Sequence, residues 1–371
     1  MNSKPSTNPR ILLIQVAPKH LDKTAVQLSL DETKQLIATY GGKIIESQVQ
    51  YRHPDRNTYL GKGKLEWLRK TVKDQDIDIV IINDIIRSAQ IYRLEKKLWD
   101  IYHLIKVWDR VDLILNIFDQ HATTTESKLQ IQLARLKHIG PRARGLGQDF
   151  FSRQGGGVGT RGLGETNIEI EQRHLRHQMH KIQKQLQKIE NQKQSRLNRR
   201  SDQGIGPVAL VGYTSAGKTT LFNALTGKQK QTNLGLFTTL DTVVGKLKIP
   251  NQSQPILISD TIGFIADLPP DLIQAFNSTL MESLQAQLIL HVIDATDHRL
   301  NDKVRVVNQI LQSLHADQPT ILVFNKLDQI DHKTRNFISL QYADYNHIFI
   351  SSKTGQRLEQ LKQRISQHFF T

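Results

Sequence analysis

The 371-residue sequence contains no cysteine, which excludes a disulfide framework and a thiolate metal site. It also lacks any apolar run approaching the roughly 18 residues of a membrane-spanning helix, and its start is polar rather than signal-like. Hydrophobic residues still make up 38% of the chain, which is enough to form real cores. These features predict a soluble cytoplasmic protein of two or three domains with a disordered start over residues 1–10.

Acidic residues are scarce in the first half, so the net charge of +15 is unevenly placed. Residues 1–203 carry 35 basic and 22 acidic side chains, whereas residues 204–371 carry 15 and 13. The excess is densest over residues 140–200, with 13 basic and 5 acidic side chains and the histidines His174, His177 and His180. Such a patch suits a polyanion, and because no lipidation signal is present we expect RNA. The alternative is a solvated helix surface that contacts nothing.

A phosphate loop of the pattern GxxxxGK[ST] covers Gly212–Thr219, between an apolar strand at Val208–Val211 and the start of a helix. Its glycines let backbone N–H groups point at phosphates, and the helix that follows adds the positive end of its dipole. Lys218 is expected to meet the outer phosphates, and the Thr219 hydroxyl to hold Mg²⁺. The alternative is a glycine turn that only joins the strand to the helix.

Three further motifs follow predicted strands in the order that guanine-nucleotide binding requires. Asp260–Gly263 is a DxxG turn, where an acid can reach the Mg²⁺ shell and a glycine N–H can contact the γ-phosphate. Asn325–Asp328 is an NKxD motif, in which the Asp328 carboxylate can accept two N–H groups of guanine, and Ser351–Lys353 can close over the base. The strands are expected over Ile256–Ser259, Leu288–Ile293, Ile321–Phe324 and Ile348–Ile350.

Two positions around the expected γ-phosphate are less determined by the sequence. A threonine-rich turn at Gly235–Asp241 should complete the Mg²⁺ shell, but spacing alone does not choose between Thr238 and Thr239. Phe264 follows the DxxG turn, where small GTPases usually place a glutamine that orients water. Either hydrolysis is slow until a partner supplies the missing group, or another residue of the chain supplies it. A role for Phe264 in packing alone is compatible with both.

The first 110 residues alternate apolar runs with helical patterns, which predicts a small parallel α/β domain. Its helices should end at Gly41-Gly42 or follow Gly61–Gly63, and Ser88 is the expected N-cap of the last one. Gly61–Gly63 also invites a phosphate-binding interpretation, but the rest of such a motif is missing. We expect strands over Ile11–Val16, Lys43–Ser47 and Ile77–Ile82, and helices over Asp31–Tyr40, Lys64–Val72 and Ser88–Trp99.

Two long helical patterns between these parts predict an antiparallel helical hairpin. The apolar positions are Leu129, Leu133 and Leu136 in the first helix and Leu175, Met179, Ile182, Leu186 and Ile189 in the second. The tip, Gly140–Gly164, holds 9 glycines and four arginines, which indicates a flexible loop that orders on a phosphate backbone, or else a mobile linker. The predicted domains are the α/β domain at 11–110, the hairpin at 111–200 and the GTPase domain at 204–371.

The chain resembles the HflX family of translational GTPases over nearly its whole length. The blocks that carry the resemblance outside the nucleotide motifs are Tyr59–Lys64, Asp109–Phe118, His121–Ala134 and Thr160–Thr166. The resemblance implies an N-terminal α/β domain, a helical hairpin and a Ras-like P-loop GTPase domain, in that order. It also implies a protein, expected to be a monomer, that binds the large ribosomal subunit and its rRNA and splits stalled or idle ribosomes, often after stress.

The resemblance also assigns the GTP site residue by residue. It aligns Phe237–Asp241 with the family's Phe-Ala-Thr-Leu-Asp pattern, which favours Thr239 over Thr238 and makes Thr219 and Thr239 the Mg²⁺ ligands. Lys218, Thr239 and Gly263 are then the catalytic residues, and Phe264 fits slow hydrolysis accelerated on the ribosome. The expected nucleotide contacts are Gly212, Tyr213, Thr214, Ser215, Ala216, Gly217, Lys218, Thr219, Phe237, Thr238, Thr239, Leu240, Asp241, Asp260, Thr261, Ile262, Gly263, Asn325, Lys326, Leu327, Asp328, Ser351, Ser352 and Lys353.

The sequence departs from the family pattern in four places. Ser215 replaces an asparagine linked to a stimulatory potassium ion, and Leu163 replaces a proline of the hairpin tip. Thr125 and Ser127 stand where histidine and glycine are common, and the sequence ends at Thr371 without the C-terminal extension of some relatives. An alternative function, from another class, is an RNA-binding or RNA-remodelling module that GTP switches without ribosome splitting.

Overall fold

The computed structural model describes residues 8–151, 167–201, 207–228, 236–237, 243–249, 255–266, 272 and 286–370. Contacts divide the chain into two compact units. The first joins Met1–Gln120 to Leu129–Gln185, and the second joins His121–Lys128 to Leu186–Thr371. Each unit is described by itself below, and the predicted domain boundaries stay predictions.

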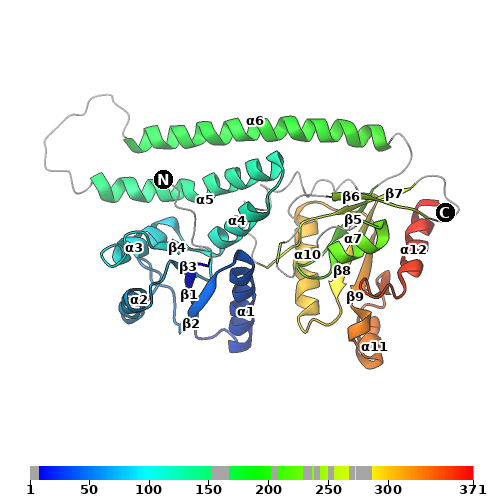
Figure 1. Cartoon of the computed structure of the whole chain (residues 1–371), viewed down its shortest axis with the longest axis horizontal. Coiled ribbons are helices and arrows are strands. Elements are labelled where there is room, and N and C mark those ends of the chain that lie inside the picture. Colours follow the sequence, from blue (N-terminus) through cyan, green and yellow to red (C-terminus); the bar gives the residue numbers. More distant parts are fainter. Residues whose placement is uncertain are drawn as a thin grey trace. The chain divides into compact units, whose positions relative to one another are not determined.

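The first unit contains a four-stranded parallel sheet in the order β2-β1-β3-β4, which confirms the predicted α/β architecture (Figure 1). Its core forms where Leu12, Ile14, Val80 and Ile82 of the central strands pack together. The strands are β1 (Arg10–Ala17), β2 (Lys43–Tyr51), β3 (Ile79–Ile82) and β4 (Lys106–Trp108). The helices are α1 (Lys23–Tyr40), α2 (Lys62–Asp74), α3 (Ser88–Leu98) and α4 (Arg110–His121).

Three helix starts differ from the prediction. Helix α2 begins at Lys62 rather than Lys64, with Gly61 as its N-cap, and a local hydrogen bond explains each of the other two differences. Helix α1 begins eight residues early because the Asp22 carboxylate accepts the Thr24 N–H at 3.1 Å and caps the first turn. Ser88 is not the N-cap of α3 but its first helical residue. The cap is Arg87, whose N–H donates to the Gln90 side chain at 3.1 Å.

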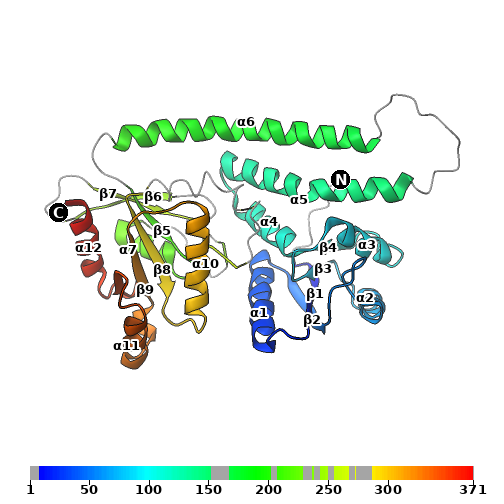
Figure 2. The same cartoon turned by 180° about the vertical axis from the view of Figure 1, so that it is seen from behind.

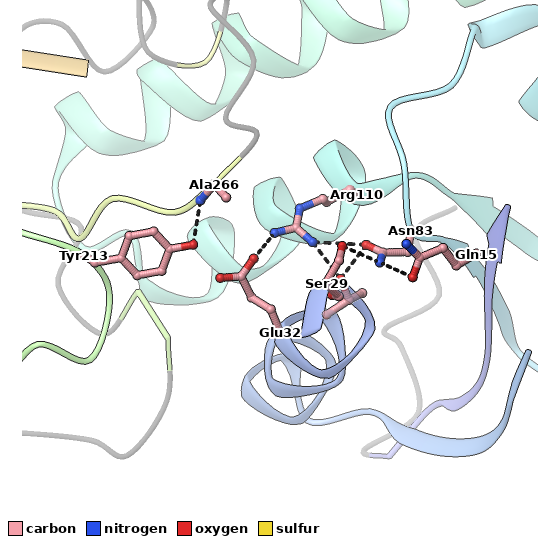
Figure 3. A network of polar contacts seen from close by, with 8 residues as sticks. Gln15, Ser29, Glu32, Asn83, Arg110, Tyr213 and Ala266 are labelled. Carbon is pink, nitrogen blue, oxygen red and sulfur yellow. Dashed lines mark hydrogen bonds and ion pairs between the residues drawn. The ribbon is translucent and has the colours of Figure 1, made fainter. Parts of the chain in front are cut away.

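A buried polar network ties α1 and α4 to the carboxyl ends of β1 and β3 (Figure 3). The Arg110 guanidinium donates to the Glu32 carboxylate at 2.5 Å, to Thr33 Oγ1 at 2.7 Å and to Asn83 Oδ1 at 3.1 Å. Asn83 in turn donates to Gln15 Oε1 at 3.1 Å. Arg110 and Glu32 are both nearly inaccessible to solvent, so removing one would leave the other as an uncompensated buried charge.

The predicted helical hairpin is confirmed. Helices α5 (Thr125–Phe151) and α6 (Asn167–Ser201) run antiparallel and side by side in both views (Figures 1 and 2). Lys193 near the end of α6 pairs with Glu126 at the start of α5 at 2.7 Å, as an antiparallel register requires. The apolar positions predicted in the second helix are half-buried, whereas basic residues between them are exposed. Those half-buried residues are Leu175, Met179, Ile182, Leu186 and Ile189.

The predicted tip loop is too long at its start. Helix α5 continues through Gly140 to Phe151, so the first twelve residues of the expected loop are helical. An established helix extends without a new nucleation step, which opposes the cost of about 1 kcal/mol for each glycine and about 3 kcal/mol for Pro141. The good helix formers between the glycines, such as Arg142, Ala143 and Leu146, favour that extension. The glycine-rich remainder, residues 152–166, lies outside the described residues.

The second unit contains a six-stranded sheet in the order β10-β9-β8-β5-β7-β6, with only β6 antiparallel to its neighbour. Apolar residues of β5, β7 and β8 pack against α7 and α12 in its largest core cluster. The strands are β5 (Val208–Val211), β6 (Val243–Leu247), β7 (Ile256–Asp260), β8 (Leu288–Asp294), β9 (Thr320–Asn325) and β10 (His347–Phe349). The helices are α7 (Lys218–Thr226), α10 (Leu300–Ser313), the 3₁₀ turn η1 (Leu327–Gln329), α11 (His332–Gln341) and α12 (Leu358–Phe370).

All five predicted strands of this unit are present. Four of them lead directly into the predicted nucleotide motifs, and because these strands are parallel the motifs meet at one edge of the sheet. Within the described part of the chain, no helix combines the length and apolar character needed to cross a bilayer.

Candidate nucleotide-binding site

The phosphate loop joins β5 to α7, and two of its glycines are required by geometry. Gly212 has φ 153° and Gly217 has φ 91°, both in the region that side-chain-bearing residues avoid. A Cβ at Gly212 would also clash with the Val292 carbonyl oxygen, and one at Gly217 would clash with the Asn325 side chain. The loop can therefore take this path only with glycine at both positions.

Lys218 begins α7 and is buried beneath the loop. Its ammonium donates to the Gly212 and Tyr213 carbonyl oxygens, each at 3.0 Å, which holds it inside the curve of the loop. Burial lowers the pKa of Lys218 to about 8, although the Asp260 carboxylate partly opposes that shift. Burial disfavours the charge on this ammonium, and the negative charge of a bound phosphate would stabilise it.

Two oxygen-bearing side chains meet next to Lys218. The Thr219 hydroxyl donates to Asp260 Oδ2 at 3.0 Å, which brings the phosphate loop and the end of β7 together. Asp260 is fully buried, and the neighbouring Thr261 hydroxyl donates to the Leu210 carbonyl at 2.6 Å. A hydroxyl beside a carboxylate is the donor set that a hard divalent cation prefers. The other predicted ligand, Thr239, lies outside the described residues, as do Thr238, Leu240 and Asp241.

Phe264, the residue after the DxxG turn, is bonded to the phosphate loop through main-chain atoms. The Thr214 N–H donates to the Phe264 carbonyl at 2.8 Å, and the Phe264 N–H donates to the Gly212 carbonyl at 3.1 Å. A Cβ at Gly263 would lie 2.9 Å from Thr214 Cγ2 and 3.1 Å from Lys218 Nζ, so only glycine fits without a shift. Phe264 itself is 2% exposed, and its ring packs inside the protein. This burial fits the packing role, which is compatible with both alternatives for how the water is oriented.

Asn325 holds three loops together. Its side-chain amide donates to the Ala216 carbonyl of the phosphate loop at 2.9 Å and accepts the Ser352 N–H at 2.9 Å. Because both ends of the buried amide are used within the protein, Asn325 acts as a connector between the motifs.

Asp328 is exposed in the turn η1, beyond the end of β9. A hydrogen bond from the Ser351 side chain keeps the pKa of Asp328 below its usual value, so the group is an ionised acceptor. Lys326 adopts φ 65° and pairs with Asp294 at 2.5 Å, which directs the backbone toward that turn. The Asp328 carboxylate is thus adjacent to Ser351, the first residue of Ser351–Lys353.

Phe237, an expected nucleotide contact, has a backbone φ of 59° and a buried side chain at the edge of the expected Mg²⁺ loop. One other feature of the site had no part in the sequence prediction. His291 lies in the middle of β8, directly beside the phosphate loop, and is 1% exposed. A histidine inside the apolar run Leu288–Ile293 is the signal that could have drawn attention to it.

Comparison with known proteins agrees with this geometry. Family models match residues 27–119 (GTP-binding GTPase N-terminal), 121–200 (GTP-binding GTPase middle region) and 207–326 (50S ribosome-binding GTPase). The GTPase HflX of Caldanaerobacter subterraneus subsp. tengcongensis is 40% identical over 92% of this chain and 77% of its own length. The GTPase HflX of Escherichia coli is 35% identical over 91% of this chain and 78% of its own length.

The fold has a solved counterpart in the crystal structure of the SsGBP and GDP complex. That chain is 24% identical, with a TM-score of 0.54, and the match covers 97% of this chain and 98% of that one. The HflX relatives and the family models identify a protein that binds GTP and hydrolyses it. The chain belongs to the HflX family of P-loop GTPases.

Proposed function

We propose that this GTPase associates with the large ribosomal subunit and splits or rescues stalled or idle ribosomes. The observation that carries the proposal is the hairpin, in which α6 turns its apolar side chains inward and exposes basic ones. Exposed cations at Arg176, Lys181, Lys184 and Lys188 follow one another along the helix and suit the phosphate backbone of rRNA. The description of the model that matches residues 207–326 as a ribosome-binding GTPase supports the same partner. Such a protein would act in the cytoplasm, and we expect it to be a monomer.

The site residues divide the work of hydrolysis among them. Lys218 meets the outer phosphates and stabilises the charge that develops on the transferring phosphoryl group. Thr219 and Thr239 would hold Mg²⁺ with Asp260 in its shell, and the metal would neutralise further phosphate charge. Asp328 accepts the two N–H groups of guanine, and Ser351–Lys353 closes over the base.

The nucleotide acts as a switch for the hairpin. GTP would order the loops at Thr239 and Gly263 through its γ-phosphate, and this state favours docking of the hairpin on rRNA. Since Phe264 is packed inside the protein, the water must be oriented by another group, and the ribosome is the place where hydrolysis becomes fast. Hydrolysis then releases the factor.

The test is GTP turnover with and without purified large subunits. We expect turnover to rise on the subunit, and equal rates would refute the coupling. Sedimentation with a non-hydrolysable GTP analogue separates splitting from the alternative of a GTP-switched RNA module. Co-migration with large subunits supports the proposal, whereas binding of free RNA without co-migration favours the alternative.

A further inference from the structure

A small cavity lies beneath the phosphate loop, between the end of β8 and the start of α10. Its volume is about 10 Å³, close to the room that one water molecule needs. Thr214 of the loop and His291 of β8 both line it, together with the apolar side chains of Leu300 and Val304. Lys218 and Thr219 do not line it, whereas Tyr213, Thr214 and Ala216 of the phosphate loop do, as do Asp294 and Lys303.

Two polar atoms of the residues that line the cavity have no hydrogen-bond partner. Thr214 Oγ1 and His291 Nδ1 are both inaccessible to solvent, and neither donates to nor accepts from any protein atom. The residues are 5% and 1% exposed, so bulk water does not serve them. Buried polar groups in native proteins are paired with protein or with ordered water, and the two residues that carry these atoms line one small cavity.

His291 is neutral at physiological pH. Burial, reinforced by the nearby charge of Lys218, lowers the pKa of His291 to about 3. A neutral imidazole can donate or accept at Nδ1, as can a threonine hydroxyl at its oxygen, so one water can bond both. A charged imidazole at this place would repel Lys218, which the low pKa avoids.

We propose that Thr214 and His291 hold one internal water molecule beneath the phosphate loop, and that His291 is thereby a positioning residue for GTP hydrolysis. Thr214 is the point through which such a water acts. Its N–H bonds the Phe264 carbonyl at 2.8 Å, and its methyl group packs where the DxxG glycine passes. The water holds the Thr214 hydroxyl, the remaining group of that residue. It thereby sets the position of Gly263, the glycine expected to contact the γ-phosphate.

The test uses the full chain and two matched pairs of variants. His291→Leu and Thr214→Val delete the polar atoms, whereas His291→Asn and Thr214→Ser keep one near the same place. We expect each deletion to lower kcat for GTP about tenfold, the effect of about 1.4 kcal/mol lost from the transition state. The affinity for GDP should fall much less, because GDP lacks the phosphate that Gly263 contacts. Asn and Ser should recover most of the lost rate.

The double variant His291→Leu/Thr214→Val decides whether one water serves both residues. If it does, either deletion already releases the water, and the double variant should be no slower than the slower single variant. A roughly hundredfold loss, the product of independent effects, would overturn the proposal, as would equal losses of GDP affinity and kcat. If the leucine variant fails to fold, a high-resolution crystal structure of the unchanged protein decides the point. A water within hydrogen-bonding distance of both atoms supports the proposal, and a dry cavity refutes it.

Discussion

Lys218 should make nucleotide binding depend on pH well below the range where an ordinary lysine titrates. Its pKa in the nucleotide-free protein is about 8, so roughly nine tenths of the molecules carry the charge at pH 7 and about one tenth at pH 9. Only the charged form meets the phosphates productively. The Kd for GDP should therefore rise about tenfold between pH 7 and pH 9.

The matched control is Lys218→Arg, because a guanidinium stays charged over this whole range. Fluorescence titration of a labelled GDP, repeated in steps from pH 7 to pH 9.5, gives the ratio of the two Kd values. Ionisation of the guanine base affects both proteins equally, so it cancels in the ratio of their Kd values. A wild-type Kd that changes less than about twofold, or an arginine variant that follows the same curve, would refute the reasoning.

The stability of the nucleotide-free protein should change in the opposite direction. The unfolded chain holds the Lys218 proton up to its ordinary pKa of 10.5, whereas the folded chain releases it at about 8. Between these values the unfolded state binds more protons, so the contribution of Lys218 to stability rises with pH. Urea unfolding at pH 8 and pH 10 measures that contribution, with Lys218→Arg again as the reference.

Three other substitutions test separate parts of the structure. Asp328→Asn should shift the preference from guanine toward xanthine nucleotides, and unchanged GTP affinity in a competition assay would show that the base is read elsewhere. Arg110→Met should lower the free energy of unfolding by about 3–5 kcal/mol, because it leaves the buried Glu32 carboxylate unpaired; a urea-unfolding loss below about 1 kcal/mol would contradict that. Gly217→Ala should abolish GDP binding through its clash, whereas Gly227→Ala, at φ 70° with open space around it, should cost about 1 kcal/mol of stability and leave binding intact in the same titration.

Most strands of each sheet were predictable because they are short apolar runs near turn residues, whereas β4 and β6 were not predicted. Val208–Val211 and Ile321–Phe324 are buried along their whole length, and such strands have no polar face to confuse the pattern. Helix ends were harder. The start of α1 depends on a cap from the Asp22 side chain, and a polar cap does not appear in the periodic pattern of apolar residues. Helix α5 continues past Gly140 because extending a helix costs less free energy than nucleating one.

The nucleotide motifs were predictable because their chemistry depends on local spacing, as in Gly212–Thr219. The contacts that join one motif to another were not. The Asn325 side chain donates to a carbonyl 109 residues earlier in the chain, and no sequence pattern indicates that two such distant residues are in contact. His291 belongs to the same class, since its role depends on which loop lies above β8 in the folded protein.

The bridge between the phosphate loop and residue 264 uses only peptide groups. Only the N–H and C=O of residue 264 take part, so proline is the substitution that breaks the bridge directly. Because the Phe264 ring is also buried, the side chain that follows the DxxG turn can vary only among residues that fill the same apolar space. The peptide bridge and the packing of this side chain therefore set two separate limits on which residue can follow the DxxG turn.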